Sequence, residues 1–84
     1  MDSLHDLIML WRGWETTEKW DQCFLVTHTE SGSTVEAAFD KGFYYITVKL
    51  KGENPAKLET KIKGYKKAYR YIKMKCRFLN GAVR

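Results

Sequence analysis

The side chains that most often carry out chemistry in proteins are few in this sequence of 84 residues, and they stand far apart. The two histidines are His5 and His28, and the two cysteines are Cys23 and Cys76. A catalytic histidine needs a nucleophile or a carboxylate within hydrogen-bond reach, and neither histidine has an evident partner of this kind in the sequence. Cys23 and His28 are five residues apart, a spacing that puts them on opposite faces of a strand. The sequence therefore predicts that the protein is not an enzyme and has no catalytic residue.

The sequence also contains no motif for a metal or a cofactor. Cys23 and Cys76 lack CxxC spacing, and there is no glycine-rich phosphate loop and no GxSxG nucleophile motif. We therefore expect no metal site and no cofactor. An isolated cysteine behaves as a small hydrophobic residue, so both thiols are expected to be reduced and partly buried, with a single disulfide as the alternative.

Charge is distributed unevenly along the chain. Residues 1–42 hold three basic side chains against eight acidic ones, a net charge of −5, whereas residues 43–84 hold twelve against two, a net charge of +10. Asymmetry of this size between two halves suggests an anionic partner for the basic half.

Most of the basic residues fall on one side of a predicted C-terminal helix. At helical spacing, five of them share an arc of roughly 80°, and Lys67 lies just beyond it; the five are Lys63, Lys66, Arg70, Lys73 and Arg77. No acidic residue follows Glu59, so these charges repel one another unless a partner relieves the repulsion. Lysine and arginine on a rigid element suit phosphate binding, and Lys49 and Lys51 are expected to extend the patch. Nucleic acid is therefore the first predicted partner.

An acidic protein surface is the second predicted partner, which would make the protein a small inhibitor or adaptor. Tyr71, Met74 and Phe78 form a second apolar patch on the predicted helix, which suits a partner interface, a homodimer, cover by the first helix, or base stacking. Trp14 and Trp20 are candidate anchors if they are exposed, because tryptophan is a frequent interface hot spot.

The elements that must position these residues begin with a helix over about residues 3–13, where Leu4, Leu7, Ile8 and Trp11 recur at helical spacing. Residues 15–19 extend this helix or make a further turn. Three strands in an antiparallel meander are then predicted over 23–29, 34–39 and 43–51, with Ile46, Val48 and Leu50 facing inward and Lys49 and Lys51 facing outward.

A long amphipathic helix from Pro55 to Leu79 completes the predicted α+β fold. Asn54 and Pro55 suit its start, and an apolar stripe recurs at spacings of four and three residues; the stripe is Leu58, Ile62, Tyr65, Tyr69, Ile72, Cys76 and Leu79. The alternative is a shorter helix, to about Lys67, followed by a fourth strand. Gly64 is a residue that can end a helix, and residues 70–78 also alternate with the period of two that is typical of a strand.

The predicted order of helix, three strands and basic helix resembles the topology of the double-stranded-RNA-binding domain. The resemblance is one of topology alone. The basic cluster of this sequence lies in the middle and at the end of the last helix and not at its start, so no residue roles are carried over.

The length fits a single domain over residues 1–84. No signal peptide and no apolar run near the roughly 20 residues of a membrane span are present, so we expect an intracellular, cytoplasmic protein that does not bind membranes.

Overall fold

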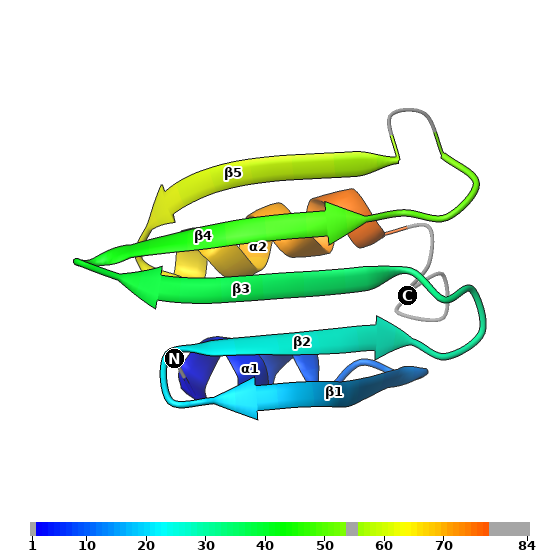
Figure 1. The fold of residues 1–84 in the computed structure, drawn as a ribbon, viewed down its shortest axis with the longest axis horizontal. Helices are drawn as coiled ribbons and strands as arrows, with labels where there is room; N and C mark the ends of the chain where they lie inside the picture. Colours follow the sequence, from blue (N-terminus) through cyan, green and yellow to red (C-terminus); the bar gives the residue numbers. More distant parts are fainter. Residues whose placement is uncertain (1, 54–55, 78–84) are drawn as a thin grey trace.

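The computed structural model describes residues 2–53 and 56–77, and it is an α+β fold in two layers (Figure 1). Five antiparallel strands form one sheet in which neighbours in the sequence are neighbours in space. Both helices lie on the same face of this sheet, so its other face is open (Figure 1). In chain order the elements are α1 (Asp2–Ile8), β1 (Trp14–Trp20), β2 (Cys23–His28), β3 (Thr34–Asp40), β4 (Phe43–Lys49), β5 (Lys57–Lys63) and α2 (Tyr65–Cys76).

The three predicted strands are confirmed as β2, β3 and β4. Alternating burial along each strand sends one set of side chains into the core and the other to the open face, as the period of two requires. On β4 the inward residues include Ile46 and Val48, and Leu50 just after it is also buried, as the sequence predicts. Lys49 is exposed on the open face.

The first helix is shorter than predicted, and the segment after it is a strand. After Ile8 the backbone tightens into turns, in which the Leu10 amide donates to the Leu7 carbonyl at 3.3 Å and the Trp11 amide to the Ile8 carbonyl at 2.9 Å. Residues 14–20 then form β1 at the edge of the sheet, paired with β2 from Trp14 opposite His28 to Trp20 opposite Cys23. The prediction of more helix here was wrong, because adjacent threonines and flanking tryptophans favour an extended chain and β2 supplies the pairing partner.

The prediction of a long C-terminal helix is also wrong, and so is the alternative of a helix followed by a strand. The structure has the reverse order, a strand followed by a short helix. Residues 57–63 form β5, whose alternation puts Leu58, Thr60 and Ile62 toward the core. Leu58 and Ile62 are four residues apart, a spacing that fits one face of a helix as well as one face of a strand. Gly64, at φ 91°, precedes α2 instead of ending a helix. With five strands in the sheet, the resemblance to the double-stranded-RNA-binding topology is lost.

α2 packs against β4, β5 and α1 through the second half of the predicted apolar stripe. Ala68, Ile72 and Cys76 are buried, and Tyr69 packs against the same core. The predicted helix boundaries at residues 54–55 and 79–81 lie outside the described residues.

The helical layer is joined by a bond between distant parts of the chain. The Trp11 indole N–H donates to the Tyr69 hydroxyl at 3.0 Å, and the Trp11 ring packs edge-on against Trp14.

Within the described residues, no helix has the length and apolar character needed to span a membrane.

Candidate nucleic-acid interface

The outer face of α2 and its C-cap residue together carry five exposed cations. The helix turns its small and apolar residues to the sheet, so most of its long basic side chains point to solvent, whereas Lys75 lies over the Tyr71 ring. The five are Lys66, Lys67, Arg70, Lys73 and Arg77, which we call the α2 cation face. Met74 lies among them and is 57% exposed.

The α2 cation face has no acid on its own helix. The first turn, where a carboxylate would suit the helix dipole, holds Lys66 and Lys67 instead. None of the five cations forms an ion pair with any residue that the structure describes. The face is therefore an uncompensated row of positive charge on a rigid support.

Lys63 does not belong to this face, because it lies on β5 and not on a helix. It stands opposite Phe43 on the open side of the sheet. Its neighbour on that side, Lys61, places its ammonium group 4.4 Å from the centroid of the Phe43 ring and 5.7 Å from that of Tyr45. The prediction that Lys63 joins the helical arc is therefore wrong, since the arc begins at Lys66.

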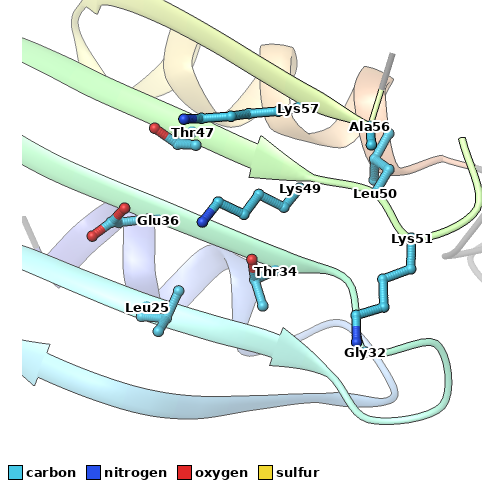
Figure 2. A pocket seen from close by; sticks show the side chains of 10 residues that line it. All are labelled: Leu25, Gly32, Thr34, Glu36, Thr47, Lys49, Leu50, Lys51, Ala56 and Lys57. Atoms are coloured by element: carbon cyan, nitrogen blue, oxygen red, sulfur yellow. The ribbon is translucent and has the colours of Figure 1, made fainter. Parts of the chain in front are cut away.

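Lys49 and Lys51 lie away from the α2 cation face. Lys49 is on the open face of β4 and Lys51 is in the turn that follows, where both line a hollow at one end of the sheet (Figure 2). Lys57, at the start of β5, lines the same hollow, and we call this site the lysine pocket. The structure thus divides the predicted basic residues between two surfaces on opposite layers of the molecule.

The predicted partner-interface residues do not form one patch. Trp14 is 6% exposed and belongs to the core, and Tyr71 packs partly against that core, where burial is the main cause that raises the pKa of its hydroxyl. Met74 and Trp20 are exposed, and Trp20 is 65% exposed at the edge of the sheet. Phe78 lies outside the described residues.

A row of side chains across the open face was missed by the sequence reasoning. The register places Trp20, Cys23, Ala38, Tyr45 and Lys61 side by side on five successive strands. The row depends on β1 and β5, neither of which was predicted. The clearest signal was the alternation over residues 57–63, with lysine, glutamate, lysine and lysine on one side.

Each histidine contacts a hydroxyl group, and neither cysteine is in a disulfide. The Nε2 atom of His5 lies 2.8 Å from the Thr16 hydroxyl, and the Nδ1 atom of His28 lies 2.8 Å from the Ser31 hydroxyl. Both cysteines are free thiols, and burial raises the pKa of Cys76 to about 12. No cluster of three or more potential metal ligands occurs among the described residues.

The strands follow one another across the sheet in the order of the sequence, so the acidic first half and the basic second half of the chain lie at opposite edges of the sheet. β1, β2 and β3 occupy one side of the sheet and carry most of the acidic residues of the sheet. β5 and α2 lie on the other side and carry most of the basic ones.

Comparisons with protein-family models, with curated proteins and with solved structures give no match, so the interpretation of these surfaces depends on their chemistry.

Proposed function

We propose that the protein binds nucleic acid without catalysing a reaction, and that the α2 cation face makes the principal contacts, with phosphates. The observation that carries this proposal is a row of exposed cations on one helix that has no acidic residue. Such a row raises the free energy of the folded chain through repulsion, and a polyanion relieves the repulsion while releasing its own counterions.

The dimensions of the face fit a run of phosphates. Residues 66–77 of a helix span about 17 Å at a rise of 1.5 Å per residue. One strand of a duplex carries a phosphate every 3.4 Å or so along its axis, so several phosphates lie within the length of the face. Contacts of this kind fix position and affinity without reading sequence.

The test compares two variants with the same change in net charge. In Lys67→Gln/Arg70→Gln two charges are removed from the α2 cation face, and in Arg12→Gln/Lys41→Gln two exposed charges are removed from the acidic half. Binding of fluorescent single-stranded and duplex DNA and RNA would be measured as a function of salt. We expect micromolar affinity at low salt for the wild-type protein and, on duplex DNA, a slope of log K against log salt that is reduced in magnitude by about 1.8 in the α2 variant alone.

Two results would count against the proposal. If both variants lose affinity equally, net charge and not the α2 cation face governs binding. If the wild-type protein shows no salt-sensitive binding to any of the four nucleic acids, nucleic acid is not the ligand.

A protein partner is the second candidate, and the exposure of Trp20 is the observation that favours it. A tryptophan that is 65% exposed on an edge strand presents a large apolar surface to solvent, as interface anchors do. If Trp20→Ala abolishes capture of a cellular protein that Lys67→Gln/Arg70→Gln only weakens, a protein interface at the open face takes precedence.

A further inference from the structure

The lysine pocket is a shaped site with a volume of about 500 Å³, within the range of small-molecule sites. Its walls come from β2, the β2–β3 turn, the start of β3, the end of β4, the turn after β4 and the start of β5. Leu25, Leu50 and Ala56 supply apolar surface. The hydroxyls of Thr34 and Thr47 lie beside the lysines (Figure 2). A ligand there would meet both apolar surface and hydrogen-bond donors.

The cations of the pocket are placed against electrostatic preference. Lys49 stands directly opposite Lys57 in the β4–β5 register, and like charges directly opposite each other destabilise a sheet. Lys57 is partly compensated by Glu59, at 3.8 Å. Neither Lys49 nor Lys51 forms an ion pair with a described residue, so two positive charges are free to bind an anion.

Lys51 is held in position by the neighbouring turn. Its backbone amide donates to the hydroxyl of Ser33, a fully buried side chain, at 3.1 Å. Ser33 is bonded in turn to Ser31, whose hydroxyl contacts the buried His28. The end of the Lys51 side chain lies along Gly32, where a Cβ atom would come within 3.3 Å of it (Figure 2). This network orders the β2–β3 turn against the turn that carries Lys51.

Glu36, at the other end of the pocket, limits what the ligand can be. Figure 2 shows the Lys49 side chain extending past Thr34 toward Glu36, while Lys51 lies at the opposite end of the pocket, beside Gly32. A carboxylate accepts hydrogen bonds from hydroxyl or amino groups and repels a second anion. The ligand must therefore be negative where it meets Lys49 and Lys51, apolar where it meets the leucines of the pocket, and a hydrogen-bond donor where it reaches Glu36.

We propose that the lysine pocket binds the phosphate monoester of a nucleoside. Lys49 and Lys51 contact the phosphate, the apolar wall contacts the base, and Glu36 accepts hydrogen bonds from the sugar hydroxyls or the exocyclic amine. Two sources share this chemistry, a free mononucleotide and the phosphorylated end of a nucleic acid strand, and only the second source rests on the proposed function.

The test follows backbone amide shifts by ¹⁵N NMR while adenosine 5′-monophosphate is added at low salt, with adenosine as the probe that lacks phosphate. We expect shifts at Thr34, Thr47 and Lys51, a dissociation constant below about 1 mM, and binding of adenosine weaker by about tenfold or more. A pentanucleotide with and without a 5′-phosphate then distinguishes the two sources, since only a strand-end site prefers the phosphorylated form.

Three variants locate the site. Lys49→Gln/Lys51→Gln should weaken the nucleotide by about tenfold or more, because both phosphate contacts are lost. Lys61→Gln/Lys63→Gln is the matched control, since it removes the same charge from the same sheet face outside the pocket. Lys67→Gln/Arg70→Gln should leave nucleotide binding unchanged, because α2 lies on the other layer.

The pocket proposal would be overturned if all three variants weakened nucleotide binding equally, or if the amide shifts were centred on α2. It would also be overturned if the wild-type protein bound adenosine and its monophosphate with equal affinity. Nucleotide binding at the pocket without any binding of nucleic acid would leave this proposal standing and overturn the proposed function. Binding of nucleic acid without nucleotide binding at the pocket would leave the proposed function standing and overturn the pocket proposal.

Discussion

Cys76 shows how burial sets the chemistry of a single side chain. Its thiol is fully enclosed under α2, and burial raises its pKa from 9.0 to about 12. The thiolate is the nucleophilic form, so this thiol is inert in the folded protein at ordinary pH. Cys23 lies on the open face of β2 between Trp20 and Ala38 and is only partly buried.

We predict that the two thiols differ in reactivity and that Cys76 makes the fold sensitive to alkali. At pH 8 a thiol reagent should label Cys23 in native protein and both cysteines in denaturant. Above pH 9 the unfolded chain loses a thiol proton that the folded chain keeps up to about pH 12, so the unfolding free energy should fall by up to about 1.4 kcal/mol per pH unit. The raised pKa values of Tyr44 and Tyr71 act in the same direction at higher pH.

Urea unfolding at pH 8 and at pH 10.5 measures this loss. Cys76→Ala should show a smaller loss than the wild-type protein, while Cys23→Ser should match the wild type and leave native protein almost unlabelled. Equal labelling of both thiols in the native state would contradict the buried position of Cys76.

Among the elements, β5 and α2 show what local pattern can and cannot determine. The residues of the α2 cation face were predicted because helical periodicity over 65–77 is a local property of the chain. β5 was not predicted, because its apolar residues fit both periods and the choice depends on pairing with β4. The same tertiary dependence hid β1, whose strand character comes from pairing with β2. Lys49 was correctly predicted to face outward, but its separation from α2 depends on the sheet between them.

We predict that Lys67→Glu separates stability from binding. A glutamate in the first turn of α2 interacts favourably with the helix dipole and can pair with Arg70 three residues later. The unfolding free energy should rise by about 0.5–1 kcal/mol at low salt, while affinity for nucleic acid falls by more than about tenfold.

Chemical denaturation and the salt-dependent binding assay measure the two effects on one sample, with Lys67→Gln as the control that removes charge without reversing it. A variant that gains stability and keeps its affinity would show that the α2 cation face is an ordinary solvated surface.

For the whole molecule, the order of the strands converts a property of the sequence into a property of shape. A meander keeps the acidic first half and the basic second half on separate sides, so the molecule is electrically polarised across the sheet. The charge asymmetry was visible in the sequence, but its direction in space required the five-stranded order. A polarised molecule approaches a polyanion with its basic side first, and this raises the association rate at low salt.

The same meander has a consequence for how the chain folds. Each strand pairs with the next along the chain, so the entropy of loop closure is small for every hairpin. The Trp11–Tyr69 hydrogen bond spans 58 residues and joins α1's trailing turn to α2, so we expect it to form after the sheet. Tyr69→Phe should then lower the unfolding free energy by about 1–2 kcal/mol and accelerate unfolding by about 5–30-fold, with the folding rate nearly unchanged.

Stopped-flow folding and unfolding in urea measures both rates, and Tyr65→Phe on the more exposed side of α2 is the matched control. A slower folding arm for Tyr69→Phe would mean that the two helices meet before the sheet is complete. The expected result instead makes the junction of the helices the last part of the molecule to assemble and the first to open, so the lifetime of the native state is set at this junction and not in the sheet.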